Sequence, residues 1–244
     1  MGWAELALGA AAVGAGGRGG DGTGGNAFVQ AEGDLTRTGS ITILGGASVT
    51  SRGIGGTGGA EGSEGEAAGR GGDGFGGTFT QTNAFDSNLV NGAYILAFGD
   101  NGFLDIGSVS LDASGHGGDA IFGPGGRGGD GLGGLAQAGS FFGNGDGSVA
   151  QGDVTFGAVS AFSDGIGGDG GFNVETESVT GDGGDGSAGG AFLTGRLGTV
   201  DTGTVSLTAR GFGGLGNTGG AAFGGFAEAT GTDGVTMSTG TVIT

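Results

Sequence analysis

The chain has 244 residues, of which 73 are glycine, one is proline and none is cysteine. The single proline excludes a collagen triple helix, which needs abundant proline in a strict three-residue period. The lack of cysteine excludes disulfides, thiolate catalysis and cysteine-based metal sites. The formal net charge of −18 repels phosphates and anionic lipids, so we do not expect either to be a partner. No apolar run approaches the roughly 18 residues that a membrane helix needs, so we expect no membrane insertion.

The N-terminal stretch MGWAELALGAAAVGAGG looks like a signal peptide only in its apolar character. It lacks a basic first region, and Glu5 lies inside the apolar run, which is unlike a signal peptide. The segment AELAL at 4–8 instead fits a strand pattern that recurs downstream. We therefore interpret the N-terminus as part of a repeat.

A five-residue pattern with apolar and polar residues in strict alternation predicts β-strands with one buried face. It reads GSITI at 39–43, GSVSL at 107–111, GDVTF at 152–156 and GTVSL at 203–207, and GTVIT at 240–244 departs from it only at the last residue. Together with 4–8, these segments place the following pairs in the core: Leu6/Leu8, Ile41/Ile43, Val109/Leu111, Val154/Phe156 and Val205/Leu207.

Each strand except the last precedes a motif of a small residue, any residue and then G-x-G-G. Its copies are AVGAGG at 12–17, SRGIGG at 51–56, ASGHGG at 113–118, SDGIGG at 163–168 and ARGFGG at 209–214. A glycine tract then closes on a Gly–Gly pair, and a second extended segment follows. We predict that the second residue of this segment forms an interior column of alternating small and large side chains: Ala27, Phe79, Ala136, Phe192 and Ala227.

The glycine tracts, such as RGGDGFGGT at 70–78, have a period of three. This period favours an extended three-fold helix like polyproline II, here called polyglycine II, in which bare backbones pack closely. Flexible linkers are the alternative. Arginine and aspartate recur three residues apart, which favours order, and we predict that they mark the stacking register: Arg18, Asp21, Arg70, Asp73, Arg127 and Asp130.

One unit cannot bury its apolar face alone, so successive units must stack. We predict an all-β fold, a right-handed parallel β-solenoid of about 35-residue units with polyglycine-II-like legs. It forms a single repeat domain over 1–244, of about five and a half units, with insertions at 83–102 and 171–180. An antiparallel β arrangement beside a polyglycine II helix bundle is the alternative.

Few residues offer site chemistry. His116 is the only histidine and occupies the variable position of the turn motif. We recognise no nucleophile–base or paired-carboxylate spacing, and we expect no enzyme, no catalytic residue, no metal ligand and no cofactor. GHGGDAIFG at 115–123 resembles one copy of a calcium-binding nonapeptide, which leaves weak calcium binding open. The threonines that could form an ice-binding array differ in position between units: Thr36, Thr38, Thr42, Thr78, Thr80 and Thr82.

The segment NAFDSNLVNGAYILAFGDNG at 83–102 is rich in apolar residues. Repeat proteins concentrate function in such insertions on one face. Phe85, Tyr94 and Phe98 are therefore the candidate binding residues, for a cell-surface receptor or a glycan. The alternative is that the segment forms an additional strand pair that covers a sheet edge.

Units such as GTVSLTARGFGGLGNTGG resemble the glycine-rich β-strand-repeat regions of large bacterial surface proteins, the filamentous-haemagglutinin-like and autotransporter adhesins. The tracts are also similar to the polyglycine II sandwich of phage tail-tip adhesins. The resemblance covers the whole chain, implies an extracellular location at the bacterial cell surface and transfers no site residue. We expect a structural stalk or self-stacking filament subunit, whose partner is itself, end to end, or the rest of a longer chain. An adhesin acting through its insertions is the second candidate, and an ice- or calcium-binding repeat is the third.

Overall fold

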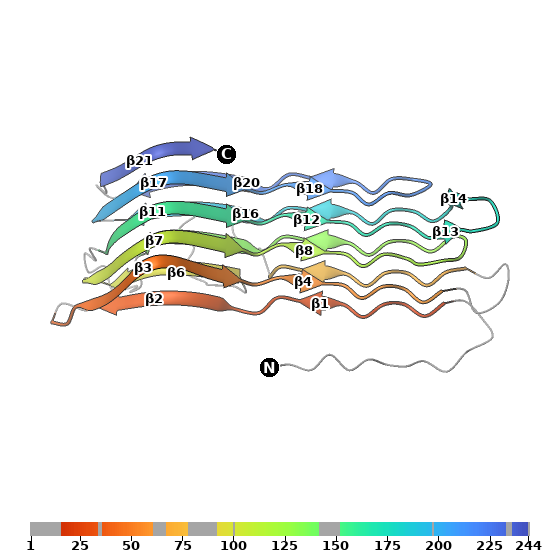
Figure 1. The fold of residues 1–244 in the computed structure, drawn as a ribbon, viewed down its shortest axis with the longest axis horizontal. Helices are drawn as coiled ribbons and strands as arrows, with labels where there is room; N and C mark the ends of the chain where they lie inside the picture. The colour runs from red at the N-terminus through yellow and green to blue at the C-terminus, as the bar shows by residue number, and fades with distance from the viewer. Residues whose placement is uncertain are drawn as a thin grey trace.

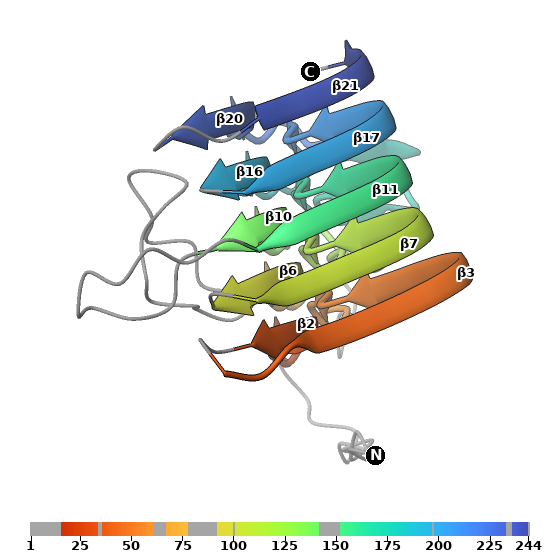
Figure 2. The same ribbon diagram turned by 90° about the vertical axis from the view of Figure 1, so that its left-hand side faces the viewer.

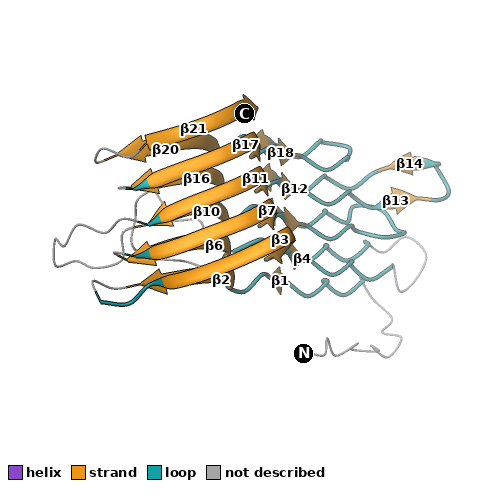
Figure 3. Cartoon of the chain, turned by 60° about the vertical axis from the view of Figure 1, so that its left-hand side comes forward, coloured by secondary structure: helices purple, strands orange, loops and turns teal. Residues whose placement is uncertain are grey.

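The computed structural model describes residues 16–33, 36–60, 67–77, 92–99, 101–141, 152–196, 198–232 and 236–243. These ranges contain β-strands and no helix. The long strands gather on one side of the molecule and the glycine-rich segments extend from the other side (Figures 1 and 3).

The long strands form two parallel sheets of five strands each. One sheet holds β2 (Ala27–Gly33), β6 (Gly92–Gly99), β10 (Leu135–Phe141), β16 (Gly190–Arg196) and β20 (Phe226–Thr232). The other holds β3 (Gly39–Thr50), β7 (Gly102–Asp112), β11 (Asp153–Phe162), β17 (Thr199–Thr208) and β21 (Thr236–Ile243). Figure 2, viewed along the glycine-rich segments, shows the strands of both sheets as stacked rungs.

The glycine-rich segments form two more parallel sheets of very short strands. The leading legs, which precede the first long strand of each rung, carry β1 (Gly22–Thr23), β5 (Gly74–Phe75), β9 (Gly131–Leu132), β15 (Gly186–Ser187) and β19 (Ala222–Phe223). The trailing legs, which follow the second long strand, carry β4 (Gly53–Ile54), β8 (Gly115–His116), β12 (Gly165–Ile166) and β18 (Gly211–Phe212). Each leg therefore stacks on the equivalent leg of the neighbouring rung.

Within the described ranges, the chain thus winds through five stacked coils: β1–β4, β5–β8, β9–β12, β15–β18 and β19–β21. Within each of these four sheets, every neighbouring pair of strands is parallel. The residues align one to one except in the β3–β7 pair, where the register shifts between Ile43 and Gly46. The fold is all-β and resembles a parallel β-solenoid. The antiparallel alternative is wrong for these sheets, and the one antiparallel pair in the described residues is the hairpin of β13 (Phe172–Asn173) and β14 (Ser178–Val179).

The core lies between the two sheets of long strands, where apolar side chains from both meet. The predicted pairs Val109/Leu111, Val154/Phe156 and Val205/Leu207 are buried, and Ile41 and Ile43 are half-buried in coil 1; Leu6 and Leu8 lie outside the described residues. The strands are longer than the motif, however, and hold two apolar stretches separated by glycine. Consequently the copies at 39–43 and 152–156 align with residues 102–106 and not with 107–111.

The prediction of a column of alternating small and large side chains is wrong, because the register of the first sheet aligns other residues. The aligned residues are all alanine: Ala27, Ala93, Ala136, Ala191 and Ala227. Phe192 belongs to the adjacent column beside Gln137, and Phe79 lies outside the described residues. Alanine at every level keeps this part of the interior uniformly narrow.

The two predicted insertions have different structures. Residues 92–99 of the first one form β6, which pairs with β2 and β10, so this part of 83–102 belongs to the stack. An apolar strand buried on both faces lacks the alternation on which the prediction depended. The second segment, 171–180, contains the β13–β14 hairpin at the far end of the legs (Figure 3).

Candidate functional site

The legs are joined by a continuous set of backbone hydrogen bonds. One series of glycines alternates between the leading and trailing legs. From the second glycine on, each backbone N–H donates to the carbonyl oxygen of the previous glycine in the series, at 2.7–3.0 Å. The series is Gly20, Gly56, Gly72, Gly118, Gly129, Gly168, Gly184, Gly214 and Gly220. Other bonds run within a layer, from Gly71 N–H to Arg127 O (3.0 Å) and from Gly128 N–H to Asp182 O (2.9 Å). These bonds offset the entropy lost by ordering so many glycines.

Close packing explains why these positions are glycine. A Cβ placed on Gly129 would lie 1.9 Å from the carbonyl oxygen of Gly72, and one on Gly184 would lie 1.9 Å from that of Gly129. Such distances are far inside van der Waals contact. Any larger residue would therefore force two coils apart.

An aspartate ladder runs along the leading legs. Each carboxylate accepts the backbone N–H of the equivalent residue one coil further on, at 2.8 Å in every step: Asp73 to Asp21, Asp130 to Asp73, Asp185 to Asp130 and Ala221 to Asp185. Hydrogen bonds with an ionised acceptor are stronger than neutral ones. The ladder therefore fixes the register between successive legs.

Arginines bridge the steps of this ladder. Each contacts the aspartate of its own coil and that of the next: Arg18 with Asp21 (2.6 Å) and Asp73 (3.0 Å), Arg70 with Asp73 (2.8 Å) and Asp130 (3.0 Å), and Arg127 with Asp130 (2.8 Å) and Asp185 (3.3 Å). All six residues expected to mark the register lie in this ladder. In coils 4 and 5 the arginine position holds Asp182 and Thr218.

The trailing legs carry a second ladder that the sequence prediction missed. Asp119 Oδ1 accepts the N–H of Asp169, and Asp169 Oδ1 accepts the N–H of Leu215, both at 2.8 Å. The signal was a GGD tripeptide at the same place in two trailing legs, 117–119 and 167–169. It was overlooked because these tracts lack the arginine.

Ion pairs also join the coils where the trailing legs leave the strands. Arg52 pairs with Asp112 one coil further on, and Arg210 pairs with Asp164 of the preceding coil at 2.8 Å. The guanidinium of Arg210 also lies 5.2 Å from the ring centroid of Phe212, which is a cation–π distance. These charges are therefore engaged in contacts between coils.

Three aspartates have lowered pKa values. The N–H of Asp73 lowers the pKa of Asp21, with help from Arg18. Burial raises the pKa of Asp130, but the bonds from Arg127 and the Asp185 N–H outweigh it, and the net shift is downward. Burial likewise raises the pKa of Asp112, and the bonds from Arg52 and Ser114 reverse it. The interactions with neighbouring coils thus favour the ionised carboxylates.

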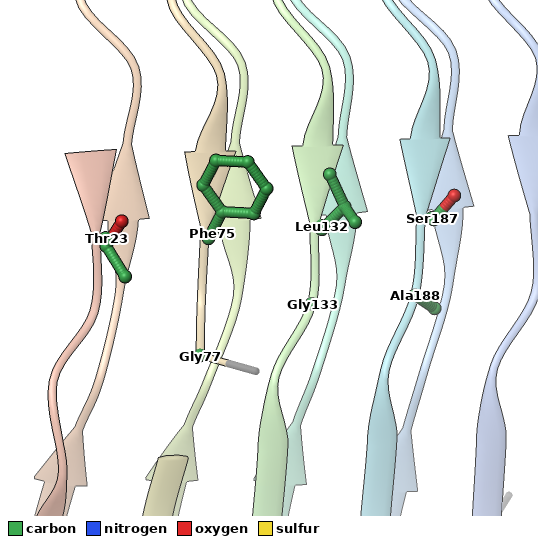
Figure 4. Close-up of a pocket in the computed structure, with 7 residues that line it drawn as sticks. All are labelled: Thr23, Phe75, Gly77, Leu132, Gly133, Ser187 and Ala188. Atoms are coloured by element: carbon green, nitrogen blue, oxygen red, sulfur yellow. The ribbon is translucent and has the colours of Figure 1, made fainter. Parts of the chain in front are cut away.

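A groove of about 440 Å³ lies over the leading legs. Figure 4 shows Thr23, Phe75, Leu132 and Ser187 in a row, one on each of four successive strands, with Gly77, Gly133 and Ala188 beside them. Its volume is within the range of ligand pockets, but the lining consists of apolar groups, backbone and two hydroxyls. This surface suits contact better than acid–base chemistry.

Of the three candidate binding residues, Tyr94 is the one whose side-chain burial the structure describes. Tyr94 is 1% exposed in β6, and burial raises its pKa, so it is not available to a receptor. Phe98 lies in the same strand, and Phe85 lies outside the described residues. Residues 92–99 form a strand within the sheet and not a binding loop.

Of the remaining candidate residues, His116 lies on β8 and is half-buried. Within the described ranges, no three or more His, Asp or Glu side chains gather where they could hold a metal ion. Thr42 aligns with Asp105 and not with another threonine, Thr36 and Thr38 are exposed, and Thr78, Thr80 and Thr82 lie outside the described residues. The described part of the chain also has no helix that could cross a membrane.

Comparison with protein-family models, with curated proteins and with solved structures finds no match for this chain.

Proposed function

We propose that this chain is an extracellular structural repeat protein, a stalk or filament subunit of a bacterial surface appendage. The observation that carries the proposal is the continuity of contacts through all five coils. Apolar columns, backbone hydrogen bonds and the aspartate ladder each run from one coil to the next. A protein built in this way maintains length and stiffness, which is what a stalk requires.

The use of polar side chains supports the same proposal. The ion pairs of Arg18, Arg70, Arg127 and Arg210 all join neighbouring coils. Enzyme sites, in contrast, direct several titratable groups into one cleft. The resemblance of the repeat pattern to bacterial surface proteins adds the extracellular location to the proposal.

The finer geometry belongs to the proposal as well. We infer a right-handed winding, because crossovers between parallel strands are right-handed in nearly all proteins. The basic unit is about 35 residues, lengthened in some coils by extra segments. The legs adopt polyglycine II geometry, since their interleg hydrogen bonds recur with the three-residue period of that helix.

Immunogold electron microscopy of intact cells that make the protein tests this function. Antibodies against the purified chain are expected to label thin appendages or the outer surface without permeabilisation. Permeabilised cells and cells lacking the coding sequence are the controls. Labelling confined to the cytoplasm would contradict the proposal.

Adhesion is a second candidate, favoured by an apolar surface at the far end of the legs. Phe122 and Phe172 form a parallel bridge there, both are exposed, and they line a pocket with Ile121 and Asp119. A Phe122→Ser, Phe172→Ser double variant should then lose binding to target cells or glycans in a solid-phase assay. Unchanged binding by this variant would exclude the surface as the adhesive site.

A further inference from the structure

We propose that the coil-1 end of the stack binds the coil-5 end of a second copy, so that copies join head to tail. The inference rests on the structural function proposed above and names the partner and the surface. In Figure 1 these ends are the lower rung, β2 and β3, and the upper rung, β20 and β21. The contacts at this junction continue those that already join neighbouring coils.

The first observation concerns glycines in coil 1. Gly20 begins a column that continues through Gly72, Gly129, Gly184 and Gly220. A Cβ on each later member would lie 1.8–2.1 Å from the carbonyl oxygen of the member below, so glycine is required there. Beside Gly20 itself, no atom of the described residues lies within 4 Å of such a Cβ.

Gly25 begins a second column of the same kind. A Cβ added to Gly189 or to Gly225, its later members, would lie 2.0 Å from the carbonyl oxygen of the glycine one coil below. The space beside Gly25, like that beside Gly17, is open in the described structure. Coil 1 therefore has the glycines of an occupied interface, although no described coil lies beneath it.

The second observation concerns the apolar columns. Val29 and Ile41 of coil 1 are only half-buried, whereas their counterparts Ile95 and Leu104 in coil 2 are fully buried. At the other end, Ala229 of coil 5 is half-buried above the fully buried Leu193. Both ends expose the core that another coil would cover.

The two ends match in register. Continuing the columns across a junction places Ala227 against Ala27 and Ala229 against Val29 of the next copy. The leading leg of coil 5 then lies beneath that of coil 1, with the Gly220 carbonyl below Gly20. The leading legs and the first sheet of long strands then meet as they do between coils 4 and 5.

One hydrogen bond of the aspartate ladder is missing at this junction. The Asp21 N–H of the upper copy would face Ala221, which has no carboxylate, and Thr218 stands where lower coils have arginine. The junction is therefore weaker than the contacts between coils within one chain. Thr218→Arg combined with Ala221→Asp supplies the missing carboxylate and its arginine.

Sedimentation velocity of the full chain from 1 µM to 1 mM, with electron microscopy of the same samples, tests the junction. The wild type is expected to form linear species as concentration rises. Gly20→Ala should weaken association at least tenfold without changing the melting temperature of the monomer. Gly224→Ala is the matched control, because its surroundings are open and the same column already holds Ala188; it should associate like the wild type. Thr218→Arg/Ala221→Asp should strengthen association at least tenfold.

A wild type that stays monomeric at 1 mM overturns the proposal, and so does a Gly20→Ala variant that associates normally. If Gly20→Ala instead lowers the melting temperature of a monomeric protein, other residues of the same chain cover this end, and the second copy is wrong as occupant. Surface labelling and sedimentation are independent, so failure of the proposed function and failure of this junction give different results.

Discussion

At the scale of single residues, Asp130 shows how one carboxylate joins three coils. Its Oδ1 accepts the N–H of Asp185 above it, its Oδ2 accepts Arg70 below it, and its own N–H donates to Asp73. No other residue type of this size offers two charged acceptor atoms at the correct reach. The register of the legs therefore depends on a few carboxylates.

Asp130→Ala should destabilise the protein by about 1–3 kcal/mol, because it leaves a half-buried N–H without an acceptor. Asp130→Asn keeps an acceptor oxygen and loses only the partly exposed ion pairs with Arg70 and Arg127, so its cost should stay below about 1 kcal/mol. Denaturant unfolding followed by circular dichroism measures both. Asp105→Ala, on the exposed face of β7, is the control. Equal losses for the two Asp130 variants would show that charge, and not the N–H acceptor, is decisive.

At the scale of elements, the sequence predicted the strands with apolar–polar alternation and the charged residues of the leading legs. Alternation reports which face of a strand is buried, and β7, β11 and β17 follow it. It failed for β6, since Tyr94 and Leu96 are buried as well as Ala93 and Ile95. A strand covered on both faces has no period, so it cannot be distinguished from an apolar insertion.

The leading legs should lose stability in acid. The pKa values of Asp21 and Asp130 are lower in the folded protein than the value of about 3.9 for unfolded aspartate. Their contribution is therefore complete above about pH 4–5 and is lost as the pH falls through the folded pKa values. The melting temperature should be nearly constant from pH 5 to 8 and decline below about pH 4. Calorimetry measures this, and in Asp130→Asn the acid-dependent decline should be smaller.

At the scale of the whole molecule, parallel stacking could be expected from the repeats, but the pairing of particular residues could not. The distance in sequence between equivalent strands varies, as the alanine column from Ala27 to Ala93 and Ala136 illustrates. Only the three-dimensional register decides which of two similar motifs in a strand meets its neighbour. This is why the copies at 107–111 and 152–156 were aligned incorrectly.

The cost of an apolar deletion should depend on the coil that holds it. Leu104 is fully buried in coil 2 and Ile41 is its half-buried partner in coil 1. Leu104→Ala should cost about 2–5 kcal/mol, and Ile41→Ala about half as much. Unfolding in denaturant at micromolar protein, where copies are separate, measures both. Equal costs would indicate that coil 1 is covered in the monomer.

The direction of the hydrogen bonds between coils has a mechanical consequence. They run along the stack axis, and coils 1 and 5 lie at its opposite ends (Figure 1). When the chain of an outermost coil is pulled along the stack, its bonds to the next coil are loaded first, so the coils detach one after another instead of yielding together. Each detachment releases a whole coil of slack chain, and the protein extends in steps that limit the force passed to whatever it is attached to.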